Sequence, residues 1–175
     1  MADQVQNQLG LDKVYLMPTY LPPHVDEKKT ISSEHRLAML ELAVADNPCL
    51  DIEPIELIRK GKSYTYDTMK ALKEANPDTD YYFIIGGDMV EYLPKWHRID
   101  DLLHLVQFVG IRRPNYPTES TYPIIWVDVP QMAISSTLIR QKVKSGCSTR
   151  YLLPENVINY IQEKGLYQDE LDNKL

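Results

Sequence analysis

Short apolar runs alternate with longer amphipathic stretches along the chain, and this alternation predicts an α/β fold. The predicted strands are residues 14–17, 50–58, 81–85, 107–111 and 124–127. The predicted helices are residues 33–46, 65–75, 102–105, 135–145 and 154–164. Strands that alternate with helices are typical of parallel sheets joined by right-handed crossovers. We therefore expect a Rossmann-like parallel sheet flanked by helices.

Length and composition narrow the class of protein. The 175 residues contain no internal repeat or linker, so we expect a single domain over residues 1–175. Cys49 and Cys147 are far apart and predict neither a disulfide nor a zinc site. A net charge of −6 argues against a nucleic-acid partner. The N-terminal residues show neither the basic nor the apolar region of a secretory signal, and no apolar run is long enough to span a membrane, so no membrane partner is expected. These features are typical of a cytoplasmic enzyme.

The strongest chemical signal is a hydroxyl-rich run at the predicted start of a helix. Ser135-Ser136-Thr137 would present hydroxyl groups and unpaired backbone N–H groups at the positive end of the helix dipole. Arg140 would add a forked pair of donors one turn later. Such a group of donors suits a phosphate. The alternative is an ordinary N-cap, which accounts for one hydroxyl but not for three followed by an arginine.

A second candidate lies where the predicted strand 81–85 runs into Gly86-Gly87-Asp88. Ligands of open α/β sheets bind at the carboxyl ends of the strands. Glycines there let a ligand approach the backbone, and a carboxylate can accept hydrogen bonds from ribose hydroxyls. The alternative is that Asp88 only caps the next helix, and from these residues alone capping is the favoured interpretation.

Aromatic and polar residues are mixed at two further places. Trp96 could stack on a flat ring and Lys95 could meet a phosphate, although a core tryptophan is the more common interpretation. Ser63-Tyr64-Thr65 opens a predicted helix, either as an N-cap or as a donor pair for a carboxylate. No nucleophile–base pair is indicated, because the histidines are scattered at His24, His35, His97 and His104.

Together these segments resemble the nicotinate-nucleotide adenylyltransferases of Gram-positive bacteria, which belong to the nucleotidyltransferase superfamily. The similarity extends nearly from end to end, through residues 11–14, 22–24, 34–36, 63–65, 83–96, 112–114 and 134–140. The last of these motifs is shared across the superfamily. Its combination with residues 91–96 is specific to the nicotinate enzyme.

The resemblance implies adenylyl transfer from ATP to nicotinate mononucleotide, which gives deamido-NAD and pyrophosphate in NAD biosynthesis. It implies Mg²⁺ that arrives with ATP and no metal ligands from the chain, and it leaves a homodimer open. The residues implied for nicotinate mononucleotide are Thr65, Lys95, Trp96 and His97. Those implied for ATP are Asp88, Ser136, Thr137 and Arg140.

The chain also departs from the family pattern. Family members carry an N-terminal strand, a Gly-Gly-Thr-Phe-type loop and a His-x-Gly-His pair, none of which is found in the printed sequence. We therefore expect a sheet without its first central strand and an impaired enzyme, and Val25 replaces a basic residue that usually follows His24. The alternatives are a non-catalytic nucleotide-binding remnant, or a related adenylyltransferase that acts on nicotinamide mononucleotide or pantetheine phosphate. The combination of Trp96 with Thr65 favours nicotinate.

Overall fold

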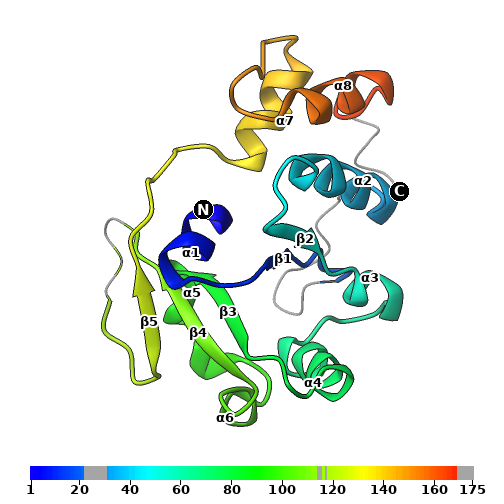
Figure 1. Ribbon diagram of the computed structural model, residues 1–175. Helices are drawn as coiled ribbons and strands as arrows, with labels where there is room; N and C mark the ends of the chain where they lie inside the picture. The colour runs from blue at the N-terminus through cyan, green and yellow to red at the C-terminus, as the bar shows by residue number, and fades with distance from the viewer. Residues whose placement is uncertain (22–30, 114–115, 117, 169–175) are drawn as a thin grey trace. The chain divides into compact units, whose positions relative to one another are not determined.

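The computed structural model describes residues 1–21, 31–113, 116 and 118–168 (Figure 1). The predictions made on Pro22-Pro23-His24, Val25 and Pro114 lie outside the described residues. Among the described residues, one compact unit holds residues 1–11, 21 and 60–131, and a second holds residues 12–20, 31–59 and 132–168. The prediction of a single domain stays a prediction.

The first unit is built on a parallel sheet with the strand order β3 (Tyr81–Gly86), β4 (Val106–Ile111) and β5 (Ile124–Val127). Tyr81 pairs with Val106, and Phe108 pairs with Ile124. Since the strands are parallel, their carboxyl ends lie at the same edge of the sheet. The three strands predicted in this part of the sequence are confirmed.

Helix α1 (Ala2–Leu9) packs on this sheet and closes the core of the first unit. Val5 of the helix is fully buried in a cluster with Val109 and Val127 of the strands. Within the sheet, Trp126 lies across Gly110, where an added Cβ would stand 2.7 Å from the indole Cζ3. Only glycine therefore fits beneath the Trp126 ring.

The other helices of the first unit are α4 (Thr65–Ala75), α5 (Gly87–Val90), the 3₁₀ helix η1 (Leu93–Lys95) and α6 (Ile99–Leu102). The prediction of α4 is confirmed. The prediction of a helix at residues 102–105 is wrong, because α6 begins at Ile99 and ends at Leu102. Ile99 and Leu102 are both buried, and Asp100 and Asp101 place carboxylates in the first turn, where the helix dipole favours them.

The second unit pairs β1 (Val14–Leu16) with β2 (Leu50–Ile52) in parallel. Its helices are α2 (Ser33–Val44), α3 (Ile55–Arg59), α7 (Ser136–Lys144) and α8 (Glu155–Glu163). Val157 and Ile161 of α8 are buried in a cluster that includes Met39 and Leu42 of α2. The predictions of β1, α2, α7 and α8 are therefore confirmed.

The predicted strand at residues 50–58 is only half right. The strand ends at Ile52, and helix α3 begins at Ile55. Pro54 lies directly before this helix, where its missing N–H costs nothing, and the Glu53 carboxylate accepts a hydrogen bond from the Ile55 N–H at 3.0 Å. The sequence did not reveal the change from strand to helix, because a short apolar run is compatible with either structure.

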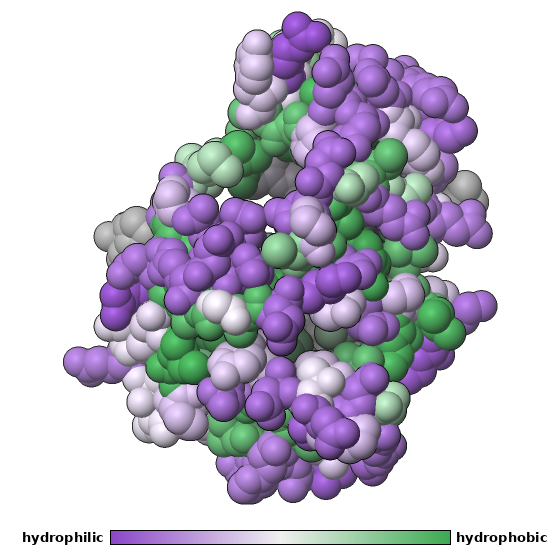
Figure 2. Space-filling model, in the orientation of Figure 1, coloured by the Kyte–Doolittle hydropathy of each residue, from purple (hydrophilic) through white to green (hydrophobic). Residues whose placement is uncertain are grey.

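Hydrophilic residues cover most of the molecular face drawn in Figure 2. Large exposed apolar side chains include Ile58, Met132 and Tyr151, which come from different segments of the chain. Across the part of the chain that the structure describes, no helix is both long and apolar enough to cross a membrane.

Candidate functional site

The first part of the candidate site lies where β3 ends. Gly86 closes the strand and acts as the N-cap of α5, so the alternative that Asp88 is the cap is wrong. A Cβ on Gly86 would collide with the Asp88 carboxylate, and a Cβ on Gly87 would lie 3.0 Å from the Ile111 carbonyl oxygen. A side chain at Gly86 would therefore displace the Asp88 carboxylate, and one at Gly87 would press on the backbone of β4.

Asp88 is held by Arg113, which follows β4 at the same edge of the sheet. The distance from Arg113 Nη1 to Asp88 Oδ1 is 3.1 Å, which is an ion pair. Oδ1 is buried and lacks a directed hydrogen bond, so the contact is electrostatic and not a well-aligned hydrogen bond. The Asp88 side chain is still 31% exposed, and this exposure belongs to the rest of the carboxylate. The Asp88 side chain is therefore partly accessible to a ligand.

Trp96 lies directly after η1 and packs into an aromatic cluster. Its ring meets Phe83 of β3 and Phe108 of β4 edge to face, with centroid distances of 5.8 and 5.9 Å. The residue is half-buried, and its indole Nε1 is buried with no hydrogen-bond partner. An unpaired buried donor costs about 1–3 kcal/mol and calls for a partner such as a water or a ligand. The ring therefore combines core packing with an unmet hydrogen-bonding need.

The start of α4 lies beside His97. Tyr64 is the N-cap and makes no side-chain capping bond, so Thr65 begins a helix whose first N–H groups are not capped by a side chain. The ring of His97 lies tilted against the ring of Tyr64, with a centroid distance of 4.7 Å and an interplanar angle of 42°. Ser63 is buried, and its Oγ has no hydrogen-bond partner. The structure thus brings His97 to the predicted donor pair of this helix.

Lys95 and Arg98 flank these aromatic residues. Lys95 is exposed, and its Nζ lies 5.4 Å from the centroid of the Tyr92 ring. The Arg98 guanidinium lies 4.1 Å from the centroid of the Tyr66 ring. Its Nε donates to Asp101 at 2.7 Å, and this hydrogen bond raises the pKa of Arg98. Arg98 therefore carries a charge that Asp101 already compensates.

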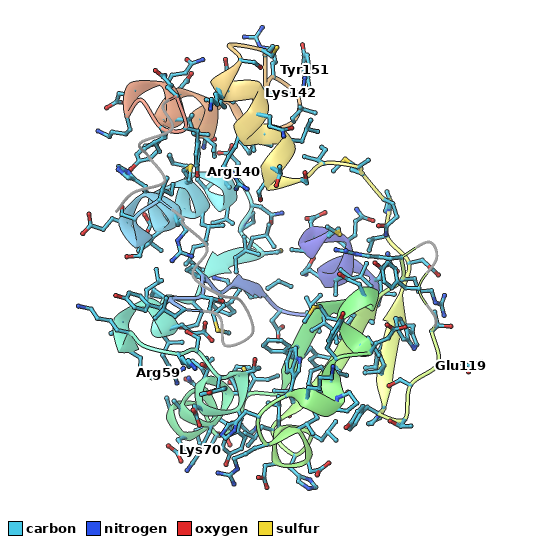
Figure 3. The ribbon with its side chains drawn as sticks, turned by 180° about the vertical axis from the view of Figure 1, so that it is seen from behind. Arg59, Lys70, Glu119, Arg140, Lys142 and Tyr151 are labelled. Carbon is cyan, nitrogen blue, oxygen red and sulfur yellow. The ribbon has the colours of Figure 1, made fainter. Side chains whose placement is uncertain are left out.

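The hydroxyl-rich motif lies in the second unit. Ser135 is the N-cap of α7, and its Oγ accepts from the Leu138 N–H at 3.1 Å. Ser136 and Thr137 begin the helix with exposed side chains, and Arg140 Nη2 donates to Thr137 Oγ1 at 3.3 Å. Arg140 and Lys142 both extend from α7 (Figure 3). The capping interpretation is right for the Ser135 hydroxyl and does not account for those of Ser136 and Thr137.

The predicted ligand-binding residues are divided between the two units. Those in the first unit are Thr65, Asp88, Lys95, Trp96 and His97. Those in the second unit are Ser136, Thr137 and Arg140. Sequence reasoning did not assign a role to Arg113 or to the two phenylalanines. The sequence did contain a signal for Arg113, because this residue follows a predicted strand at the edge of the sheet where ligands bind.

Comparison with known proteins defines the class first. Residues 1–142 match the cytidylyltransferase-like family. Two solved structures of a Plasmodium falciparum nicotinic acid mononucleotide adenylyltransferase, one complexed with NaAD and one with APC, superpose with a TM-score of 0.74 at 17% identity. Each covers 97% of this chain and 89% of the solved chain. The Rossmann-like α/β fold is therefore confirmed.

Sequence relatives then define the family within this class. A Streptococcus mutans protein named "Probable nicotinate-nucleotide adenylyltransferase" is 61% identical over 168 residues, which is 96% of this chain and 80% of the relative. A Streptococcus pneumoniae protein of the same name is 62% identical over 167 residues, or 95% of this chain and 80% of the relative. The chain belongs to the nicotinate-nucleotide adenylyltransferase family.

Proposed function

We propose that the chain transfers the adenylyl group of ATP to nicotinate mononucleotide, giving deamido-NAD and pyrophosphate in NAD biosynthesis. The observation that carries the proposal is the 61–62% identity, over almost the whole chain, to relatives named for this activity. In the reaction a phosphate oxygen of the mononucleotide forms a bond to the α-phosphorus of ATP. The bond from that phosphorus to the bridging oxygen breaks, and pyrophosphate leaves.

The first unit supplies the groups for the mononucleotide. The half-buried Trp96 ring is suited to stack on the nicotinate ring, since it is fixed by Phe83 and Phe108. Thr65 and the backbone of His97 would hold the nicotinate carboxylate at the uncapped start of α4. Lys95 is exposed and would meet the mononucleotide phosphate as a mobile point charge.

Two separate groups of residues are proposed to contact ATP, and each group is described within its own unit. Asp88, whose partly exposed carboxylate is paired with Arg113, would accept hydrogen bonds from ribose hydroxyls. Ser136, Thr137 and Arg140 would hold phosphate oxygens at the start of α7, where the N–H groups and the helix dipole favour an anion. Phosphoryl chemistry of this kind depends on positioning and charge stabilisation, and it needs no protein nucleophile.

Mg²⁺ fits this proposal as an ion that enters with ATP. Mg²⁺ commonly binds through substrate phosphates and water, with few protein ligands. Among the described residues, no group of three His, Cys, Asp or Glu side chains is placed to hold a metal ion. When bound, the ion would neutralise charge on the ATP phosphates, while the Arg140 guanidinium and the α7 N–H groups would orient them.

Calorimetric titration tests the proposed function directly. We expect the 175-residue chain to bind both ATP and nicotinate mononucleotide, and to prefer the latter over nicotinamide mononucleotide and phosphopantetheine. Formation of deamido-NAD from the two bound substrates, followed by chromatography, tests the chemistry. Binding of phosphopantetheine in place of the mononucleotide would support the related enzyme. Binding of ATP alone would support the non-catalytic remnant.

Replacing Arg113 with alanine is expected to weaken ATP binding about threefold to fivefold, because a partly exposed ion pair contributes up to about 1 kcal/mol. The effect should disappear with 2′,3′-dideoxy-ATP, since Asp88 would then have no hydroxyl to hold. Arg112→Ala is the matched control, because Arg112 pairs with Asp128 at 2.6 Å and not with Asp88. An equal loss for ATP and its dideoxy form would contradict this role of Arg113.

A further inference from the structure

We propose that Arg98 is a positioning residue for the mononucleotide site, which holds the segment of Trp96 and His97 against helix α4. The inference rests on the proposed function and adds to it a residue that does not itself touch the ligand. Arg98 follows directly after Lys95, Trp96 and His97, which are proposed to bind the mononucleotide. All the residues involved belong to the first unit.

The backbone of Arg98 is strained. Its φ of 53° and ψ of 46° lie in the left-handed region, which is unfavourable for a residue with a Cβ. Such residues persist where the surrounding structure fixes them, and they are frequent at functional sites. Arg98 connects the proposed ligand residues to α6, whose first residue Ile99 is buried, and its carbonyl accepts from the Leu102 N–H at 3.0 Å. The strained residue therefore joins the ligand segment to a fixed helix start.

The side chain of Arg98 bridges two helices. Its guanidinium lies 4.1 Å from the centroid of the Tyr66 ring, and Tyr66 is buried near the start of α4. Its Nε donates to the Asp101 carboxylate of α6 at 2.7 Å. A guanidinium over an aromatic face and a charge-assisted hydrogen bond are both attractive contacts. The side chain therefore clamps the first turn of α6 to α4.

This clamp acts on the residues that precede it in the chain. The Tyr66 ring meets the His97 ring edge to face at 6.3 Å, so one tyrosine contacts both His97 and Arg98. Trp96 packs on Phe83 and Phe108, but its buried indole Nε1 has no hydrogen-bond partner in the described structure. No hydrogen bond therefore fixes the orientation of the indole. Its position depends on ring packing and on the anchored residues that follow it.

The clamp contributes little to stability, and this separates its role from ordinary packing. The Arg98 and Asp101 side chains are 48% and 52% exposed, and exposed ion pairs add little to the free energy of unfolding. The left-handed backbone of Arg98 lowers that free energy. Glycine adopts this backbone conformation without steric cost, so we expect Arg98→Gly to keep most of the thermal stability. The same change removes the clamp and should loosen the ligand segment.

Calorimetric titration of the whole chain tests the effect on ligands. We expect Arg98→Gly to weaken the binding of nicotinate mononucleotide about threefold to tenfold and to leave ATP binding unchanged, because ATP is assigned to other residues. Asp101→Ala removes one of the two contacts of the clamp and should have a smaller effect in the same direction. Asp100→Ala is the matched control, because the exposed Asp100 carries the same charge in the same turn of α6.

A second measurement follows the indole itself and needs no ligand. In a Trp126→Phe background, Trp96 is the only tryptophan of the chain. We expect acrylamide to quench its fluorescence more strongly when Arg98→Gly is added, because the indole would be less firmly held and more exposed. Asp100→Ala in the same background should leave the quenching unchanged.

Several results would overturn the proposal. One is an unchanged mononucleotide affinity in Arg98→Gly, and another is an equal loss of affinity for ATP. A large fall in melting temperature with unchanged affinity of the folded protein would leave Arg98 as a structural residue only. Unchanged quenching of Trp96 would show that the clamp does not hold the indole. Failure of the wild type to bind the mononucleotide would instead contradict the proposed function, and the quenching measurement would still test the clamp.

Discussion

Replacing Arg140 with alanine is expected to weaken ATP binding about 10- to 150-fold and to leave the affinity for nicotinate mononucleotide nearly unchanged. A hydrogen bond to a charged group contributes about 1.5–3 kcal/mol, which corresponds to this range. Binding should weaken without vanishing, because the N–H groups at the start of α7 would remain. Calorimetric titration with each ligand separately measures both affinities.

Lys142→Ala is the matched control for this prediction. Lys142 lies in the last turn of the same helix, two residues after Arg140, and its loss removes the same unit of charge (Figure 3). If Arg140 contacts the ATP phosphates directly, only the replacement of Arg140 should strongly weaken ATP binding. Equal losses of ATP affinity in the two variants would mean that Arg140 contributes only its positive charge and not a specific contact. Unchanged ATP affinity in Arg140→Ala would show that residues 135–140 form an ordinary capped helix.

Replacing Trp96 with alanine is expected to weaken the binding of nicotinate mononucleotide by about tenfold or more, because stacking of a base on an aromatic ring contributes about 1–3 kcal/mol. The structure adds a second consequence. Trp96 packs on Phe83 and Phe108, so its loss should also lower the free energy of unfolding, by less than the about 3–5 kcal/mol of a fully buried tryptophan. Calorimetric titration and thermal unfolding measure the two effects separately.

Two further variants separate the ligand role of Trp96 from its packing role. Trp96→Phe keeps an aromatic ring but removes the indole N–H, and it should recover most of the stability and only part of the affinity. Phe83→Leu disturbs the same cluster from β3, and it should lower stability while the folded protein keeps its mononucleotide affinity. Unchanged affinity in Trp96→Ala, with a large loss of stability, would leave Trp96 as a core residue only.

Several elements could be predicted from the sequence because local signals agreed with tertiary packing. The α4 boundaries were predicted because Thr65 begins an amphipathic stretch and Asn76-Pro77 ends it. The start of α7 was predicted because Ser135 is a favourable N-cap. Residues 50–58 misled the prediction, since the apolar residues of α3 match a strand as well as a helix.

The candidate site was harder to predict than the fold. Residue types suggested that Asp88 and Trp96 touch ligands, yet nothing local indicated what the protein itself places around them. The contact between Asp88 and Arg113 joins residues 25 positions apart, and it depends on the pairing of β3 with β4. The contact of His97 with Tyr64 likewise depends on how residues from separate segments fold together. Such contacts can be identified only when the arrangement of the strands and helices is known.

The placement of Trp126 in the sheet of the first unit has a spectroscopic consequence. The chain contains two tryptophans, Trp96 and Trp126, and both belong to the first unit. Selectively excited tryptophan fluorescence therefore reports on the melting of that unit, whereas far-ultraviolet circular dichroism follows the helices of both. Coincident melting curves would mean that the two units unfold as one cooperative domain, as the sequence predicts. Separate curves would divide the chain into two folding units, with the second one silent in tryptophan emission.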